Sequence, residues 1–311
     1  MKRGFLITAF FLFCALQTGG AQILPQQRLD IPSGQYSGIT PLQRPYFAVV
    51  HDKSWGGGLH LFTLQIKADG TLSQARAWEL AANREGEPGK DNEDVVYVPE
   101  SGTLWVSAEA DASIREYNLE GYPTGRRLEV PYPFKGHRPN AGFEALAYRD
   151  SLFWTTTEFP LPGEACHRIQ RFSLGNLQAG EQYLYIEDAP EAQEENASTY
   201  VHGISAMTAL PDGRLAVLER EVYVPAGGLK DKLKAFTRTK IYLTEPQYNG
   251  QLLEKTLLSS FTTNVLNIAN YEGMCMGPEI NGKPSLLLLA DSQDGAGGLT
   301  KEYLQIILIH L

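Results

Sequence analysis

The chain has 311 residues, of which 43% are hydrophobic and 20% are charged, and its formal net charge is −9. This acidic balance disfavours a general affinity for nucleic-acid phosphates or anionic membranes, because both depend on clustered lysine and arginine. Beyond the N-terminus, no apolar stretch approaches the length of a transmembrane helix, so we expect no membrane span.

The first predicted element is a secretory signal peptide at residues 1–21. Lys2 and Arg3 form its positive start, residues 5–16 are almost entirely apolar, and residues 19–21 are small. A retained membrane anchor is the alternative, but about a dozen apolar residues are too few to span a bilayer core. We therefore expect export to the periplasm or the extracellular space. Cleavage would leave residues 22–311 as one domain, and its charge would become −11, because residues 1–21 carry two basic residues and no acid.

After residue 22 the sequence predicts many short strands and little helix. Runs rich in Val, Leu, Tyr, Trp and Thr alternate with turns of Gly, Pro, Asn and Asp. The hairpins superpose as a repeat with five openings, at residues 37–39, 93–95, 144–146, 205–207 and 272–274. The second strand of each copy ends in an acid, which is Asp52, Glu109, Glu158, Glu219 or Asp291.

The openings recur every 51–67 residues, which fits a four-stranded propeller blade of about 40–50 residues with longer loops. We predict an all-β fold, a β-propeller with five blades. A sixth blade hidden in the loops is the alternative, and a β-sandwich would not explain the repeat. A strand predicted at residues 27–31 would complete the last copy by pairing with residues 303–311. This pairing of the two ends would close the ring and leave no long free edge.

Export would permit a disulfide between Cys166 and Cys275. Cys275 lies in an apolar run and Cys166 in a polar loop, so two free thiols are favoured over a bridge. Neither cysteine belongs to a cysteine-based metal motif.

The innermost strands of a propeller line its channel, so equivalent positions of the repeat face one axis. Glu93, Glu144 and Glu272 are equivalent, and the other two copies have serine. Converging carboxylates repel each other, which raises at least one pKa or requires a cation. Ca²⁺ suits such a site because it tolerates irregular oxygen ligation. The alternative is that these glutamates only fix the blades through backbone hydrogen bonds.

The acids at the second-strand ends are further candidate metal ligands, unless they are simply solvated strand ends. Together with the three glutamates of the openings, the candidate ligands are Glu93, Glu144, Glu272, Glu109, Glu158, Glu219 and Asp291. Arg220 is a candidate to neutralise these carboxylates or to bind an anionic substrate through two hydrogen bonds.

The densest polar segment, residues 137–144, leads directly into Glu144. We predict a loop at the lip of the channel, with Arg138 acting in catalysis and with His137 and Asn140 binding substrate. A purely structural loop is the alternative. A basic stretch at residues 230–240 is interpreted as solvated, with a flap over an anionic ligand as the sharper hypothesis.

Three segments of the chain, in the same order, resemble the phytase-like family. This family is also named "esterase-like activity of phytase". Residues 138–147 resemble the family's RPNxGFEGLA, residues 204–220 its ISxxxALPDGRLLVLER, and residues 270–292 its NFEGM and the strand that follows. The chain departs from this pattern at Asp94 and Ala145, where glycine is usual, and at Ser292, where a second acid is usual. The resemblance implies an exported propeller with phosphatase-type or esterase-type activity. Its most characteristic polar positions are Arg138, Asn140, Glu144, Glu219, Arg220 and Glu272, and it supplies no nucleophile.

The leading hypothesis is a monomeric Ca²⁺-dependent hydrolase of phosphate or carboxylic esters, acting on a small anionic or ester substrate. Glu144 or Glu272 would accept the proton of an activated water. One alternative is a non-catalytic propeller that binds a ligand or protein and holds Ca²⁺ structurally. Another is a lactonase-type Ca²⁺ propeller, because this fold hosts unrelated activities.

Overall fold

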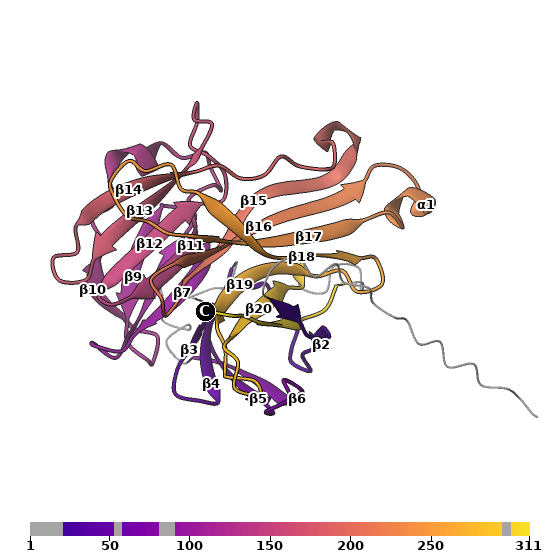
Figure 1. Ribbon diagram of the computed structural model, residues 1–311, viewed down its shortest axis with the longest axis horizontal. Helices are drawn as coiled ribbons and strands as arrows, with labels where there is room; N and C mark the ends of the chain where they lie inside the picture. The colour runs from indigo at the N-terminus through magenta and orange to yellow at the C-terminus, as the bar shows by residue number, and fades with distance from the viewer. Residues whose placement is uncertain (1–20, 53–57, 81–90, 294–299) are drawn as a thin grey trace, which may run out of the picture.

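The computed structural model describes residues 21–52, 58–80, 91–293 and 300–311. They form five antiparallel sheets arranged as a five-bladed β-propeller (Figure 1). The five-bladed prediction is confirmed, and the described residues form no sixth sheet. The predicted signal peptide falls almost entirely outside the described residues and stays a prediction.

The blades follow one another along the chain, and each begins with its innermost strand. Blade 1 comprises β3 (Tyr36–Pro41), β4 (Tyr46–His51), β5 (Leu59–Ile66) and β6 (Leu72–Glu79). Blade 2 comprises β7 (Asn92–Val98), β8 (Thr103–Ala108), β9 (Ser113–Tyr117) and β10 (Pro123–Arg127). Blade 3 comprises β11 (Phe143–Arg149), β12 (Leu152–Thr157), β13 (His167–Ser173) and β14 (Ala179–Tyr185). Blade 4 comprises β15 (Ala197–Ala209), β16 (Leu215–Pro225), β17 (Phe236–Thr244) and β18 (Lys255–Asn264).

Blade 5 joins the two ends of the chain, as predicted. It contains β19 (Asn270–Met276), β20 (Ser285–Asp291) and β21 (Tyr303–Leu308), and the short strands β1 (Gln22–Ile23) and β2 (Gln27–Arg28) both pair with β21. The pairing of β2 confirms the predicted closure, although the strand is shorter than the predicted residues 27–31. The remaining elements of the described residues are two 3-10 helices, η2 (Tyr132–Gly136) and η3 (Glu194–Asn196), and one turn of helix, α1 (Leu229–Lys232).

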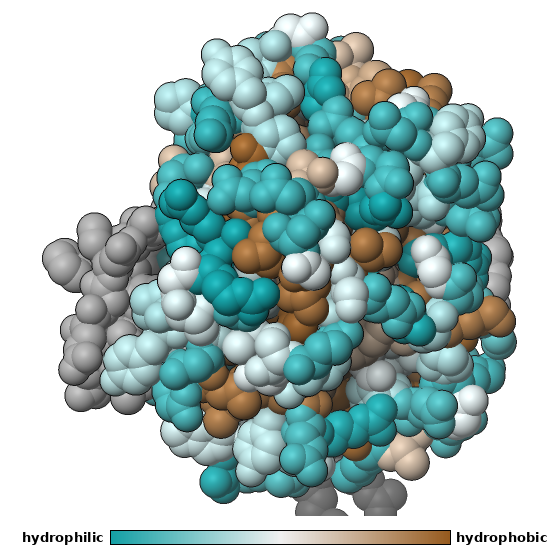
Figure 2. Space-filling view, turned by 90° about the vertical axis from the view of Figure 1, so that its left-hand side faces the viewer, coloured by the Kyte–Doolittle hydropathy of each residue, from teal (hydrophilic) through white to brown (hydrophobic). Residues whose placement is uncertain are grey.

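The core lies between neighbouring blades. Trp105 of blade 2 packs with Phe153 of blade 3, and Ile204 of blade 4 packs with Tyr183 of blade 3. Inner strands are covered on both faces, so β20 is buried throughout, whereas all five residues of the outermost strand β10 are exposed. The face in Figure 2 is accordingly mostly hydrophilic, with apolar side chains showing in separate patches.

Cys166 and Cys275 are free thiols, as predicted. Cys275 is buried and Cys166 is half-buried. Within the described residues, the longest helical segment is far too short to cross a membrane.

Candidate functional site

Every innermost strand carries a β-bulge at the position that the repeat aligned. In β7, Asn92 pairs with Ala108 and Asp94 with Ser107, so Glu93 is the extra residue. The same irregularity places one extra residue in each of the other blades, and the five are Ser37, Glu93, Glu144, Ser205 and Glu272. A bulge breaks the alternation of side chains and re-aims the extra residue. The repeat therefore delivers three glutamates to one end of the channel, where they repel each other electrostatically.

The register corrects the sequence alignment in blade 4. Phe143 of blade 3 pairs with Thr157, and its counterpart Ile204 pairs with Glu219. The position after that pair is an acid in four blades, but in blade 4 it is Arg220. This second set is Asp52, Glu109, Glu158, Arg220 and Asp291. The expected equivalence of Glu219 was thus wrong by one residue, and an arginine replaces the fifth acid.

Glycines let neighbouring blades approach closely at this end. A Cβ on Gly142 would lie 2.0 Å from the carbonyl oxygen of Glu109, and one on Gly203 would lie 2.3 Å from that of Glu158. That carbonyl of Glu158 accepts a hydrogen bond from the amide of Ile204 at 3.0 Å. The backbone contacts fix where the carboxylates of both blades project.

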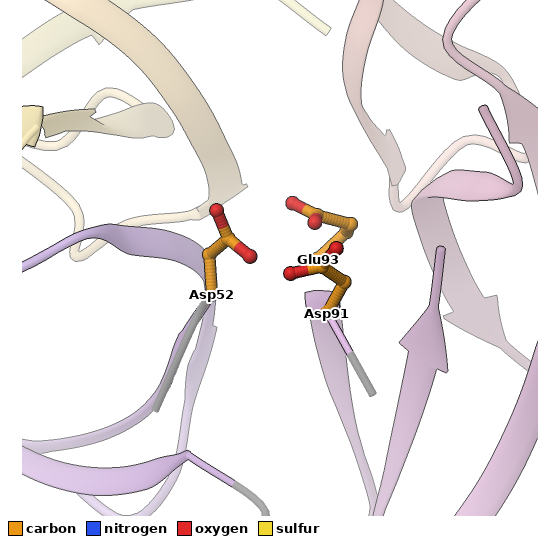
Figure 3. Close-up of side chains that lie close together, drawn as sticks. All are labelled: Asp52, Asp91 and Glu93. Atoms are coloured by element: carbon orange, nitrogen blue, oxygen red, sulfur yellow. The ribbon is translucent and has the colours of Figure 1, made fainter. Parts of the chain in front are cut away.

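The acids form two groups in which one ion could reach three carboxylates. Oxygens of Asp52, Asp91 and Glu93 all lie within 4.8 Å of one another (Figure 3). Glu109, Glu144 and Glu158 form the second group under the same limit, and all three are buried. Ca²⁺–oxygen distances are about 2.3–2.6 Å, so carboxylates this close can share one ion. The donor set is oxygen alone, which fits a hard cation.

Sequence reasoning missed Asp91. It precedes β7 and has a positive φ of 52°, and its carbonyl accepts a hydrogen bond from the amide of Glu109 at 2.7 Å. In the sequence, an acid just before a predicted strand looks like an ordinary solvent-exposed loop residue, so nothing marked Asp91 as part of the site. Only the fold brings it to Asp52 of the neighbouring blade.

Arg220 lies among these carboxylates with only 4% of its side chain exposed. Its guanidinium forms ion pairs with Glu158 and Glu272, and it lies 3.9 Å from Glu144. It also donates to Asn270 at 3.1 Å, and Asn270 donates to Glu272 at 2.7 Å. Although burial opposes its charge, the surrounding glutamates raise the pKa of Arg220 above its ordinary value. Its Nε–H is buried and has no hydrogen-bond acceptor among the described residues.

One arginine cannot balance all the acids. Burial, followed by repulsion from neighbouring carboxylates, raises the pKa values of Glu93 and Glu144 well above the ordinary range. Burial also raises the pKa of Glu158, against the pull of Arg220. Burial and the charge of Glu272 raise the pKa of Asp291 to about 8. The cluster therefore favours the uptake of protons or of a cation.

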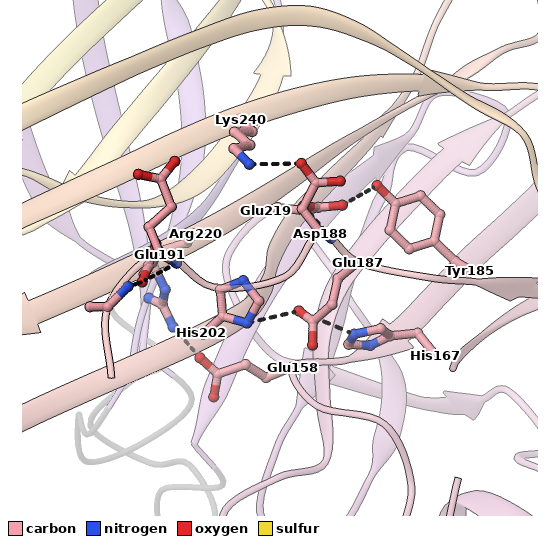
Figure 4. A network of polar contacts seen from close by, with 12 residues as sticks. Glu158, His167, Tyr185, Glu187, Asp188, Glu191, His202, Glu219, Arg220 and Lys240 are labelled. Carbon is pink, nitrogen blue, oxygen red and sulfur yellow. Dashed lines mark hydrogen bonds and ion pairs between the residues drawn. The ribbon is translucent and has the colours of Figure 1, made fainter. Parts of the chain in front are cut away.

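Glu219 lies apart from both groups. Successive residues of a strand point to opposite faces, so Glu219 points away from the side that Arg220 occupies. Its carboxylate accepts from the Tyr185 hydroxyl at 2.7 Å and from Lys255 at 2.5 Å. Lys255 also pairs with Asp188 at 2.8 Å (Figure 4 shows the network around these residues). These contacts tie the segment after β14 to blade 4.

A histidine pair lies in the same network. The Glu187 carboxylate is 3.6 Å from both Nε2 of His167 and Nδ1 of His202 (Figure 4). His202 directly precedes Gly203, which packs on Glu158, so this network borders the acidic end. Sequence reasoning did not predict it, because the three residues come from three separate elements.

The predicted lip loop leads into the site. Gly142 packs on Glu109, as described above, and Arg138 and Asn140, a few residues earlier, are both exposed. Asn140 has a positive φ of 54°, and Nδ1 of His137 lies 2.7 Å from the carbonyl oxygen of Arg138. Arg138 forms no ion pair with the described residues.

The serines of the bulges are engaged and buried. Ser37 donates to Glu93 at 3.1 Å, and Ser205 donates to the carbonyl of Tyr271 at 2.9 Å; each is 1% exposed. Asp94, at a position where the family usually has glycine, accepts from the amides of Val95 and Leu146, each at 2.8 Å. It therefore links blade 2 to blade 3.

Comparison with known proteins identifies one family. The family described as "Phytase-like: Esterase-like activity of phytase" matches residues 31–293. No curated protein matches the sequence.

Several solved structures match the chain at low identity. One is a member of the DUF4221 family from Bacteroides vulgatus, at 7% identity and TM-score 0.46, covering 94% of this chain and 99% of that chain. Kuenenia stuttgartiensis hydrazine synthase is 11% identical at TM-score 0.43, covering 88% and 80%. A catalytically inactive virginiamycin B lyase from Staphylococcus aureus with quinupristin is 10% identical at TM-score 0.41, covering 93% and 100%. These likenesses are too distant to bear on activity.

Proposed function

Because the chain belongs to the phytase-like family, whose description is "Esterase-like activity of phytase", we propose that it is a metal-dependent hydrolase of phosphate or carboxylic esters. The proposed site is the acidic end of the propeller channel. The observation that carries the proposal is the pair of three-carboxylate groups, each compact enough to hold one cation. Calcium is the proposed ion, because every donor is a carboxylate oxygen and the arrangement is irregular.

Each of two sets of residues would hold one ion. The first set is Asp52, Asp91 and Glu93, and the second is Glu109, Glu144 and Glu158. The negative charge of Asp291 repels that of Asp52 in the first set. A bound cation would supply positive charge to polarise the substrate oxygen and lower the pKa of a water. Glu219 is left out of the proposed ligands, because Tyr185 and Lys255 occupy its carboxylate.

Glu144 is the proposed general base. It is buried among other acids, and this burial, together with their repulsion, raises its pKa and favours its taking up a proton. Glu272 is held by Arg220 and Asn270, so its carboxylate has a fixed direction in which to orient a water. The buried Nε–H of Arg220 would donate to an oxygen of substrate or water in the channel.

At the lip, Arg138 is the proposed clamp for an anionic group, with His137 and Asn140 beside it. The support is that Arg138 is exposed, leads into β11 and is not neutralised by an ion pair with the described residues. This role needs the two-pronged planar geometry of a guanidinium.

We expect Arg138→Lys to lower kcat/KM for an anionic ester by about tenfold to a hundredfold, which corresponds to losing one charge-assisted hydrogen bond. The melting temperature should change little, because the residue is exposed. The lysine variant and wild type are compared by steady-state kinetics and thermal unfolding. An early-melting variant with unchanged kcat/KM would make Arg138 a structural residue.

A non-catalytic propeller that binds a ligand and holds Ca²⁺ structurally is the second candidate. It is favoured by the two bulge serines, which are buried and hydrogen-bonded and so offer no free nucleophile. A lactonase-type Ca²⁺ propeller would use the same ion with a different substrate. Assays of phosphate esters, acyl esters and lactones, with and without EDTA, separate the three candidates. EDTA-sensitive turnover of one class identifies the enzyme, and no turnover of any class favours the binding protein.

We expect Ca²⁺ affinity to increase as pH rises from about 6 to about 9, because protons compete for carboxyl groups with raised pKa values. Asp291, with a pKa of about 8, titrates inside this window. The metal-free fold responds in the opposite direction. A carboxyl whose pKa is raised by folding stabilises the fold at low pH and loses that contribution as pH rises through its folded-state value.

Two measurements check this pH dependence. In EDTA, the melting temperature should fall between about pH 6 and about pH 9, and the increase caused by saturating Ca²⁺ should be largest at the upper end. Calorimetric titration should give a lower Kd at high pH. A Kd that is constant across this window would place the ion away from these acids.

A further inference from the structure

The backbone around Glu158 is held at three consecutive carbonyl groups. The carbonyl of Thr157 lies 3.2 Å from Nδ1 of His167, and that of Glu158 accepts from the amide of Ile204 at 3.0 Å. The carbonyl of Phe159 accepts from the hydroxyl of Thr157 at 2.5 Å. The pairing of β12 with β13 ends two residues before Thr157, so the side chain of His167 takes the place of a ladder hydrogen bond there. These contacts fix the direction in which the side chain of Glu158 leaves the backbone.

His167 lies between this backbone and the carboxylate of Glu187 (Figure 4). Its ring is fully buried, and its Nε2 is 3.6 Å from Oε2 of Glu187, which is an ion-pair distance rather than a hydrogen bond. Neither of these two atoms has a hydrogen-bond partner among the described residues. Both oxygens that face the ring are acceptors only, an arrangement that suits a ring with a proton on each nitrogen. Glu187 then balances the buried charge and keeps the ring turned toward Thr157.

The same carboxylate reaches the other side of Glu158. Oε2 of Glu187 is also 3.6 Å from Nδ1 of His202. His202 directly precedes Gly203, and a Cβ on Gly203 would lie 3.0 Å from Cγ of Glu158. Burial raises the pKa of Glu158, and the charge of Glu187 adds to this effect, so the two carboxylates are close enough to interact. Glu187 therefore contacts one histidine in each of the two segments that meet at Glu158.

We propose that Glu187 and His167 are positioning residues for the cation that Glu158 would help to hold. The inference rests on the proposed function, because it takes the second set of three carboxylates as a cation site. Three carboxylates can share one ion only while each keeps its direction, and His167 and Glu187 hold the backbone that sets the direction of Glu158. Attachment of this segment to blade 4 does not depend on Glu187, because Asp188 already pairs with Lys255 at 2.8 Å.

The test is calorimetric titration with Ca²⁺ at about pH 8, at a temperature at which every variant is folded. We expect Glu187→Gln to raise the Kd of one of two ions by about tenfold to a hundredfold, the usual effect of losing a group that orients a metal ligand. The ion at Asp52, Asp91 and Glu93 should keep its Kd. Glu187→Gln replaces one atom of a partly exposed side chain, so it should fold even if a substitution of the buried His167 does not.

Two variants of His167 test how Glu187 acts. His167→Leu removes the N–H that faces the Thr157 carbonyl, and it should weaken Ca²⁺ binding as Glu187→Gln does. His167→Asn should keep more affinity than His167→Leu, because its amide can donate to the same carbonyl. Combining Glu187→Gln with His167→Leu should raise Kd by much less than the product of the two effects, since both act on one contact.

The matched control is Glu191→Gln, which removes the same charge from the same segment. Glu191 pairs with Arg238 and not with the histidines, so this variant should keep the Kd of wild type. The inference fails if Glu187→Gln and the His167 variants bind Ca²⁺ as wild type does, even if they melt earlier, because the network would then only stabilise the fold. It also fails if the effects of Glu187→Gln and His167→Leu multiply in full, because Glu187 would then act as an independent charge.

The outcome for wild type separates this inference from the proposed function. If wild type binds no Ca²⁺, the proposed calcium site and its positioning residues are both overturned. If wild type binds Ca²⁺ and the Glu187 and His167 variants keep its Kd, only the positioning role is overturned and the proposed hydrolase stands.

Discussion

Replacing Arg220 by methionine is expected to destabilise the fold by about 3–5 kcal/mol, the range found when one partner of a buried ion pair is removed. The methionine fills similar space, but it leaves the buried Glu158 and the half-buried Glu272 without their cation. Their mutual repulsion, and that of Glu144, is then uncompensated. Urea unfolding at pH 7 in EDTA measures the loss. Lowering the pH should recover part of it, because protonated glutamates no longer repel.

The control for this variant is Arg214→Met. Arg214 pairs with Asp212 in a turn where both side chains are 31% exposed, so we expect a loss of at most about 1 kcal/mol. Arg220→Lys should fall between wild type and Arg220→Met, because a lysine keeps the charge but cannot reach two carboxylates with a planar fork. If Arg220→Met unfolds at the same urea concentration as wild type, the acids are neutralised by other means and Arg220 is not their counter-ion.

Glu144→Gln is expected to lower kcat by about 10²–10⁴-fold, the contribution of a positioned general base. The amide keeps the shape of the side chain but cannot accept a proton. Since Glu144 also belongs to the Glu109 and Glu158 group, the same change should weaken Ca²⁺ binding. Kinetics at saturating Ca²⁺ separate the two effects, because a lost ligand is restored by excess ion and a lost base is not. Stability in EDTA should not fall, since the change removes one of several repelling charges.

Glu120→Gln is the matched control, since Glu120 is exposed in a turn of blade 2 and lies outside both carboxylate groups. It should leave both kcat and the Ca²⁺ affinity unchanged. If Glu144→Gln retained full kcat and full affinity, the base and the ion would have to be sought elsewhere. Loss of affinity with full recovery of kcat at high Ca²⁺ would leave Glu144 as a ligand only.

The blade repeat was predictable because the types of residues along the chain repeat with it. Short apolar runs between turn residues recur five times, and every copy needs the same inward-facing bulge. Aligning the copies was therefore enough to predict that Glu93, Glu144 and Glu272 lie at the same end of the channel. The closing strand was predictable for a similar reason, since a fifth blade with three strands leaves an edge that only the other end of the chain can cover.

The tertiary structure decided what lies around those three glutamates. Residue type favoured Glu219 as the acid at the end of the second strand of blade 4, equivalent to those of the other four blades. A shift of one residue in a strand, however, moves a side chain to the opposite face. Pairing of Ile204 with Glu219 sets that register, and it turns Arg220 toward the acids. Asp91 joins the site only because a neighbouring blade brings Asp52 beside it. Strand pattern is local, whereas register and the contacts between blades are set by packing across the whole ring.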